Sequence, residues 1–277
     1  MSLSEQRIAE LTELCRRFRV DVLTAIHAAG SGHPGGSLSV CEIMTYLYQE
    51  RMHLDAAHPD DPDRDRLVLS KGHAAPMLYR NLAEKGFIEL SELATLRRTN
   101  GLPGHPTNHT PGVEIPGGPL GQGFPAAQGM ALALRLNKSP ARVFVILGDG
   151  ELDEGIVWET AMSAAKFKLD NLIAIVDYNR VQLDGTTDEI MPLGDLAAKW
   201  EAFGWTVLEC DGHDLEALDF CVTVADGAVG APTVIIANTV KGKGVSFMEN
   251  TSAWHGKKID DESYAKAMAE LGGEMNG

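Results

Sequence analysis

The chain has 277 residues, of which 44% are hydrophobic and 23% charged, a composition typical of a folded globular protein rather than a disordered chain. Its 24 Lys and Arg against 39 Asp and Glu give a formal net charge of −15, which disfavours a nucleic-acid or anionic-membrane surface, because either would need a basic face. No apolar run reaches the roughly 18 residues of a membrane span, and the amino terminus is typical of a polar helix rather than a signal peptide, so we expect a cytoplasmic protein.

Helices are expected to dominate the first third of the chain. Apolar residues recur every three or four positions from Ile8 to Ile26, which predicts an amphipathic helix over 4–29. Residues 98–123 are rich in Gly, Pro, His and Thr without periodicity, and a loop of this length inside a compact domain is usually functional. The remaining expectations are a helix over 37–51, an acidic surface loop over 55–65, a short strand over 66–70 and a helix ending near Lys85.

The second half alternates apolar strands with helices. Residues 143–147 and 172–176 are continuous apolar runs on either side of a helix predicted over 155–168, a pattern that indicates a right-handed β-α-β unit in a buried parallel sheet. Further strands are predicted over 205–208 and 233–237, and further helices over 194–203 and 214–228. Since no repeat or linker divides the chain, we expect residues 1–277 to form one α/β domain, an open parallel sheet with helices on both faces.

Polar segments follow the two apolar strands. Gly148-Asp149-Gly150 comes after the first, and Asp177-Tyr178-Asn179 after the second. Because parallel strands joined by one crossover lie side by side, Asp149 and Asn179 should emerge at the same carboxyl edge of the sheet, where open α/β sheets bind ligands. Each motif alone is more typical of a tight turn or a cap, but the two together, each behind a core strand, indicate a ligand site.

The residue types at this edge favour a metal-bound diphosphate. Two oxygen ligands suit a hard divalent cation that shares its coordination with phosphate, and the Gly150 amide can reach a phosphate at the start of the following helix. Two unit charges of the same sign about 4 Å apart repel each other by about 4 kcal/mol at an effective dielectric near 20. Asp149 would therefore repel a diphosphate that had no metal.

This pattern resembles the signature of the thiamine-diphosphate enzymes, in which Gly-Asp-Gly is followed about thirty residues later by Asn. Within that superfamily, the sequence is similar to transketolase from about residue 27 to His255. The resemblance implies the thiamin diphosphate-binding fold and the transfer of a two-carbon ketol unit from a ketose phosphate to an aldose phosphate. Five segments carry it: SGHPGG (31–36), SKGHA (70–74), GHP (104–106), GPLGQG (118–123) and GDGELDEG (148–155).

The resemblance also implies how the cofactor is held. Asp149, Asn179 and the carbonyl of Val181 would bind Mg²⁺, with Ca²⁺ or Mn²⁺ able to substitute. Asn179, the Gly150 amide and His73 would contact the diphosphate.

The remaining implied roles concern the cofactor rings and the substrate. Gly118 and Leu120 would contact the rings, and Glu154 would lie at a subunit boundary and communicate with the opposite active site. Imidazole titrates near working pH, so histidines can bind ketose hydroxyls or exchange protons with them. The histidines implied in the substrate channel are His33, His105 and His255, the last also beside the cofactor.

The family also needs a glutamate from a pyrimidine-binding domain, and no sheet region after His255 is predicted to supply it. We therefore expect the N-terminal, diphosphate-binding subunit of a split transketolase. It would be active only with a C-terminal partner, in a heterotetramer with two copies of each subunit.

Two alternatives stay open. The Lys241-Gly242-Lys243-Gly244 segment is by itself typical of a solvated turn, but it is closer to deoxyxylulose-phosphate synthases than to full-length transketolases. Half of such an acyloin synthase is therefore the second enzymatic hypothesis, and pyruvate as obligatory donor would distinguish it. A non-catalytic cofactor-binding module is the hypothesis from a different class.

Other signals are given structural interpretations. The G-x-G-x-x-G at 30–35 follows a helix and contains a proline, so it lacks the context of a dinucleotide site. His105 and His109 flank Pro106, which argues against a helical zinc pair. Surface or helix-face positions are expected for His27, His53, His58 and His213, and buried apolar positions for the widely spaced Cys15, Cys41, Cys210 and Cys221.

Overall fold

A five-stranded parallel sheet is the middle layer of the computed structural model, which describes residues 3–272. The central strands are buried on both faces, which explains their continuous Val, Ile and Leu runs. The strand order is β1-β2-β3-β5-β4, and the expected open parallel sheet is confirmed. The strands are β1 (Arg66–Leu69), β2 (Val143–Gly148), β3 (Leu172–Tyr178), β4 (Thr206–Asp211) and β5 (Thr233–Asn238).

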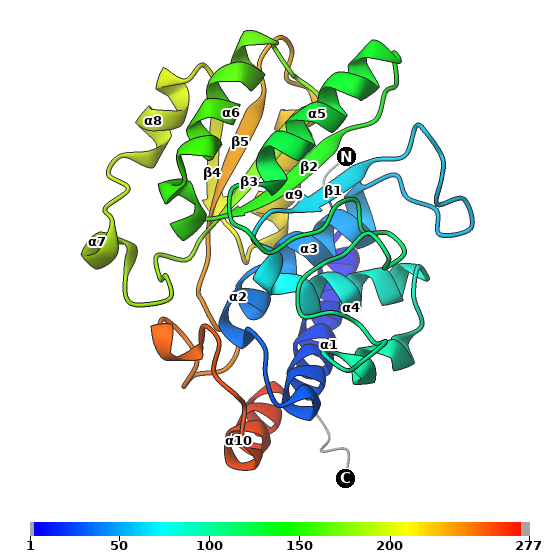
Figure 1. The fold of residues 1–277 in the computed structure, drawn as a ribbon, viewed down its shortest axis with the longest axis vertical. Coiled ribbons are helices and arrows are strands. Elements are labelled where there is room, and N and C mark those ends of the chain that lie inside the picture. Colours follow the sequence, from blue (N-terminus) through cyan, green and yellow to red (C-terminus); the bar gives the residue numbers. More distant parts are fainter. Residues whose placement is uncertain (1–2, 273–277) are drawn as a thin grey trace.

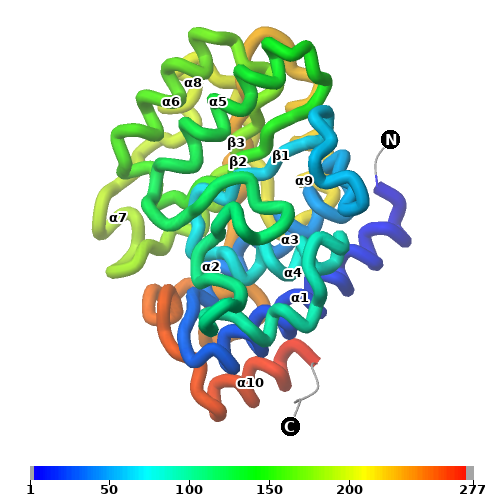
Figure 2. The backbone as a smooth tube through the Cα atoms, turned by 45° about the vertical axis from the view of Figure 1, so that its right-hand side comes forward, coloured from blue at the N-terminus to red at the C-terminus, as the bar shows by residue number. Residues whose placement is uncertain are grey.

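Helices cover both faces of this sheet (Figure 1). One face carries α5 (Gly123–Leu136), α6 (Gly155–Lys166) and α8 (Leu196–Ala202), which enclose a core containing Trp200 and Trp205 with ring centroids 5.0 Å apart. The other face carries α1 (Glu5–Ala29), α3 (Cys41–Tyr46), α4 (Ala75–Lys85), α9 (Leu215–Asp226) and α10 (Asp261–Leu271). In Figure 2, α10 runs beside the carboxyl-terminal half of α1, while the two ends of the described chain lie apart.

The first helix begins and ends where the sequence predicts. The Ser4 side chain accepts a hydrogen bond from the Arg7 amide, which caps the amino end of α1. Gly30, with φ of 67°, ends the helix in the left-handed conformation that favours glycine.

No helix within residues 3–272 is long and apolar enough to cross a membrane.

The prediction of one continuous helix over 37–51 is wrong. The segment forms α2 (Pro34–Ser39), then α3, then a π-helical turn over Leu47–Arg51. The chain bends at Val40, directly after Ser39, whose hydroxyl donates to the buried Asp177 at 2.6 Å. Anchoring Ser39 to the sheet in this way aims α2 at the carboxyl edge, which a straight continuation of α3 would not do.

Three helices were not predicted: α5, α10 and the short α7 (Thr187–Ile190). In α5 the helical signal was present, because Phe124, Ala127, Ala131 and Leu134 are buried at spacings of three and four. The irregular stretch before it ends at residue 122, close to the predicted boundary of the long loop.

Candidate active site

The sheet register brings the two polar strand ends together. Gly148 on β2 pairs with Asp177 on β3, so Asp149 leaves its strand beside the segment that carries Asn179. Asp149 accepts from the Gly150 amide at 2.8 Å and from the backbone amide of Arg180. The carboxylate therefore ties the turn after β2 to the turn after β3.

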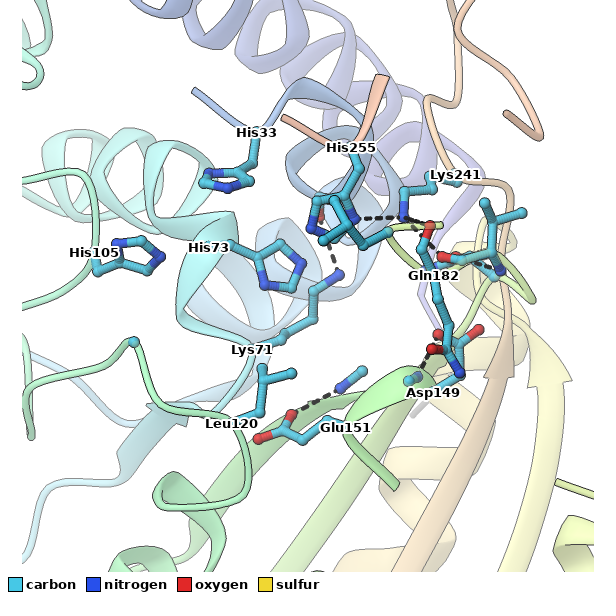
Figure 3. A pocket seen from close by; sticks show the side chains of 17 residues that line it. His33, Lys71, His73, His105, Leu120, Asp149, Glu151, Gln182, Lys241 and His255 are labelled. Atoms are coloured by element: carbon cyan, nitrogen blue, oxygen red, sulfur yellow. Dashed lines mark hydrogen bonds between the residues drawn. The ribbon is translucent and has the colours of Figure 1, made fainter. Parts of the chain in front are cut away.

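Ten of the eleven predicted site residues line one cavity of about 260 Å³ at this edge (Figure 3). The exception is Glu154, which is exposed at the amino end of α6 and beside Gly121, outside the cavity lining. The ten residues are His33, His73, His105, Gly118, Leu120, Asp149, Gly150, Asn179, Val181 and His255.

Four histidines form a cluster on one wall of the cavity. His33 is central, with ring centroids 5.5 Å from His73 and 5.6 Å from both His105 and His255. Burial and neighbouring cations lower the pKa of His33 to about 4 and that of His255 to about 3, and they lower the pKa of His73 and His105 as well. At neutral pH the wall therefore presents uncharged imidazoles, each with one donor and one acceptor nitrogen.

Glycine permits the close packing behind this wall. A Cβ on Gly36 of α2 would lie 2.9 Å from Nε2 of His73, and a Cβ on Gly72 would lie 2.8 Å from the amide nitrogen of Gly118. Gly118 itself has φ of 140°, which L side chains rarely adopt. The glycines of the SGHPGG, SKGHA and GPLGQG segments thus let three loops meet at one place.

The interpretation of residues 241–244 as a solvated turn is wrong for Lys241, which is only 2% exposed and lines the cavity. Its ammonium donates to the carbonyl of Val181 at 2.7 Å and to Nδ1 of His255 at 2.9 Å. Burial, together with the charge of Lys71, lowers the pKa of Lys241 to about 8. A lysine followed by glycine, three residues after a core strand, was a signal, but only the fold shows that the chain turns inward.

A second buried lysine, also missed from the sequence, makes an ion pair beneath the cavity. Lys71 pairs with Asp177, and Thr239 donates to the same carboxylate. Burial of Asp177 opposes its ionisation, but the ammonium of Lys71 still holds the pKa of Asp177 below its ordinary value. Asp177 also accepts from the side-chain amide nitrogen of Asn179 at 3.2 Å, so the oxygen of that amide faces away from the carboxylate.

Asp149 has no such partner. Burial and the nearby Asp177 raise the pKa of Asp149 to about 6, and within residues 3–272 no side-chain cation lies within ion-pair distance of it. Glu151, by contrast, lines the cavity with its carboxylate already engaged, since it accepts from the amides of Gly121 at 2.7 Å and Gly148 at 3.0 Å. It fastens the GPLGQG loop to the Gly-Asp-Gly turn.

The expectation for His213 is also wrong. Its Nδ1 lies 2.8 Å from Glu42, and its Nε2 accepts from the Val240 amide at 2.8 Å, so it belongs to a half-buried network rather than to the surface. Cys15, Cys41 and Cys221 are buried as expected, whereas Cys210 is only half-buried. Cys15 and Cys41 lie together beside Glu42 despite their distance in sequence.

Comparison with known proteins agrees with this geometry. The family model described as "Transketolase, thiamine diphosphate binding domain" matches residues 11–276. The chain belongs to the transketolase family. It is 47% identical over 271 residues to the 6-deoxy-6-sulfo-D-fructose transketolase subunit of Clostridium sp. (strain MSTE9), covering 97% of this chain and 98% of the relative. It is 42% identical over 273 residues to an apulose-4-phosphate transketolase subunit of Actinobacillus succinogenes, covering 98% of each.

Solved transketolases share the fold. The crystal structure of transketolase from Campylobacter jejuni superposes with a TM-score of 0.90 at 32% identity, covering 98% of this chain and 44% of that one. The predicted thiamin diphosphate-binding fold and the assignment to a transketolase-type enzyme are confirmed, and the comparisons do not favour the acyloin-synthase alternative. The chain spans less than half of that single-chain transketolase but nearly the whole length of the relatives named as subunits.

Proposed function

We propose that this chain is the thiamine diphosphate-binding subunit of a two-subunit transketolase, which moves a two-carbon ketol unit between sugar phosphates once a C-terminal partner is bound. One observation carries the proposal: the cavity buries a carboxylate, Asp149, and an ammonium, Lys241, that are not paired with an opposite charge within residues 3–272. Burying a charge without a partner is costly, so such groups mark a ligand of complementary charge.

A divalent cation fits the carboxylate. Asp149, the side-chain carbonyl of Asn179 and the backbone carbonyl of Val181 are hard oxygen donors of the kind that Mg²⁺ prefers, and Ca²⁺ or Mn²⁺ would accept the same set. Asp177 supports the assignment, because by accepting from the Asn179 amide nitrogen it fixes which end of the amide presents its oxygen. The side-chain oxygen of Asn179 accepts from the Val181 amide at 3.1 Å, and the backbone oxygen of Val181 accepts from Lys241. Each of these two oxygens therefore keeps a second lone pair that a metal could use.

A diphosphate fits the ammonium and the turn. The Gly150 amide begins a helical turn behind Asp149, and a Cβ there would lie 2.9 Å from Cγ of Gln182, so the backbone is as close as glycine allows. Lys241 would then donate to the diphosphate in place of its longest contact, the Gln182 carbonyl at 3.3 Å. Gly118 and Leu120 would contact the rings. When bound, thiamine diphosphate supplies the carbon nucleophile for the ketose carbonyl. His33, His105 and His255, being neutral, bind the hydroxyls, and a free ring nitrogen among them accepts the hydroxyl proton when the sugar C–C bond breaks.

A partner subunit is part of the proposal. The cavity, at about 260 Å³, lies just below the range of about 300–1,000 Å³ typical of small-molecule sites, so this chain does not enclose a cofactor and a sugar phosphate by itself. Relatives of the same length are named as transketolase subunits, which supports a separate C-terminal partner and, with two copies of each chain, a heterotetramer. Glu154, exposed beside the GPLGQG loop, is then a candidate for contact across subunits. A cytoplasmic location stays an expectation.

The test is reconstitution of activity. Ketol transfer from a ketose phosphate is measured with the purified chain, with a candidate partner, and with both in the presence of Mg²⁺ and thiamine diphosphate. We expect activity only in the mixture, and loss of at least about a hundredfold with Asp149→Ala, because a metal ligand and its charge are removed. Asp60→Ala, the same charge change at an exposed position, is the control and should behave as wild type. Full activity of the chain alone refutes the split enzyme, and an active Asp149→Ala complex favours the non-catalytic module.

A further inference from the structure

An arginine contacts the central histidine of the cavity. Nη2 of Arg97 lies 3.4 Å from Nδ1 of His33. A guanidinium has only donors and stays protonated, so the histidine nitrogen that faces it must be the acceptor. In a neutral imidazole with an accepting Nδ1, the proton is on Nε2.

We propose that Arg97 is a positioning residue that fixes His33 as the neutral Nε2–H tautomer, so that His33 offers a hydrogen-bond donor to a ketose oxygen in the cavity. The role toward the ketose rests on the proposed function, whereas the tautomer does not.

The loop that carries Arg97 holds its backbone in place. Arg97 has φ of 58°, and its amide donates to the carbonyl of Leu102 at 2.7 Å, while the Leu102 amide donates to the hydroxyl of Thr95 at 3.1 Å. A Cβ on Gly104 would lie 2.7 Å from Cζ of Arg97, so the guanidinium rests directly on that glycine. The loop therefore places the guanidinium over residue 104, where it contacts His33 and acts on the charge state of His105.

The opposite edge of the His33 ring is free. Nε2 lies 3.7 Å from the position of a Cβ on Gly256 and has no hydrogen-bond partner among residues 3–272. His33 lines the cavity and lies between His105 and His255 in Figure 3. Because His33 lines the cavity and its Nε2 makes no hydrogen bond to these residues, the donor that Arg97 imposes is available to a substrate oxygen.

The charges around His33 keep the ring neutral. Arg97 and His105 face it from the 95–105 loop, Lys71 and His73 from the segment after β1, and Lys241 and His255 from the segment after β5. All of these groups are cationic or neutral, and burial adds to their effect, so an imidazolium at this position is disfavoured. His255 has the same arrangement, with the ammonium of Lys241 on its Nδ1.

The tautomer can be measured on the full chain without cofactor or partner. Long-range ¹H–¹⁵N spectra of the ¹⁵N-labelled chain distinguish protonated from unprotonated ring nitrogens, and loss of one set of signals in His33→Asn assigns His33. We expect wild type to show Nδ1 unprotonated and Nε2 protonated, with a preference of about tenfold for a charge-assisted hydrogen bond. Arg97→Gln should give a mixture of both tautomers and raise the pH at which His33 titrates. Arg97→Lys, which still donates, should keep the wild-type pattern.

The control is Arg98→Gln, the same charge change at the neighbouring exposed position, which should leave the His33 signals unchanged. Unchanged signals from a histidine outside the cavity, such as His213, show that each variant is folded. A protonated Nδ1 in wild type, or identical His33 spectra for Arg97→Gln and Arg98→Gln, overturns the proposal even if the complex is an active transketolase. In an active complex, Arg97→Gln should lower kcat/KM about tenfold with Arg97→Lys restoring most of it. Spectra as expected without any transferase activity would contradict only the proposed function.

Discussion

Two regions of this protein bury charged side chains, and they do so in opposite ways. In the network that links α1 to α3, Arg19 makes paired contacts of 2.7 Å with Glu42, and His213 contacts the same carboxylate at 2.8 Å. In the cavity at the carboxyl edge, Asp149 and Lys241 are buried, and neither makes an ion pair with another side chain among residues 3–272. The first arrangement is complete within the chain, and the second is completed only by something that binds.

This difference separates stability from binding. A buried pair whose partners are both satisfied costs little to keep, but removing one partner leaves a charge stranded in a low dielectric. A buried charge that already lacks a partner destabilises the empty protein and gains from a ligand. We therefore expect substitutions in the two regions to have different consequences.

The largest effect is expected from Glu42→Gln. Removing the carboxylate leaves the guanidinium of Arg19, which is 6% exposed, without its counter-charge, and should lower the free energy of unfolding by about 3–5 kcal/mol. Urea unfolding of the purified chain measures this. Glu13→Gln removes an exposed ion pair with Arg16 and should unfold near the wild-type midpoint. If the two variants unfold alike, the network does not stabilise the fold in the way we describe.

The same network predicts a pH dependence. Burial of Glu42 by itself would raise its pKa, but Arg19 and His213 lower the pKa of Glu42 from 4.5 to about 2. A carboxyl group whose pKa is lower in the folded chain than in the unfolded chain stabilises the fold at any pH above the unfolded-state pKa. That stabilisation is lost as the pH falls toward the folded-state pKa, which for Glu42 means between about pH 4.5 and pH 2. The advantage of wild type over Glu42→Gln should therefore shrink by about 2 kcal/mol between pH 5 and pH 3. An advantage that stays constant over this interval would contradict the shifted pKa.

Much of the fold was predictable because its signals are local. The apolar runs of β2 and β3, the period of α1 and the Gly-Asp-Gly turn each lie within a few adjacent residues, and the parallel register then places Asp149 beside the end of β3. The missed α5 had such a signal too, because its buried residues are helically spaced.

What was missed depends on contacts between distant segments. Lys241 meets Val181 sixty positions away, Glu42 meets His213 at a separation of 171, and Arg97 meets His33 at 64. No periodicity or spacing encodes these pairings, because the loops that bring them together are themselves positioned by the packed helices. The bend at Val40 has the same origin, since it depends on Ser39 reaching Asp177.

A smaller change is expected from the unpaired ammonium of the cavity. Lys241→Gln removes the unmatched ammonium, so binding of thiamine diphosphate with Mg²⁺, measured by calorimetry on the chain or its reconstituted complex, should weaken about tenfold through loss of one charge-assisted hydrogen bond. Lys243→Gln, two residues away and half-buried, should bind as wild type. The free energy of unfolding of the cofactor-free Lys241→Gln chain should not fall, because no carboxylate loses its partner. A variant that is destabilised like Glu42→Gln but still binds the cofactor normally would show that Lys241 belongs with the stabilising network, and that the cavity does not bind an anion at this position.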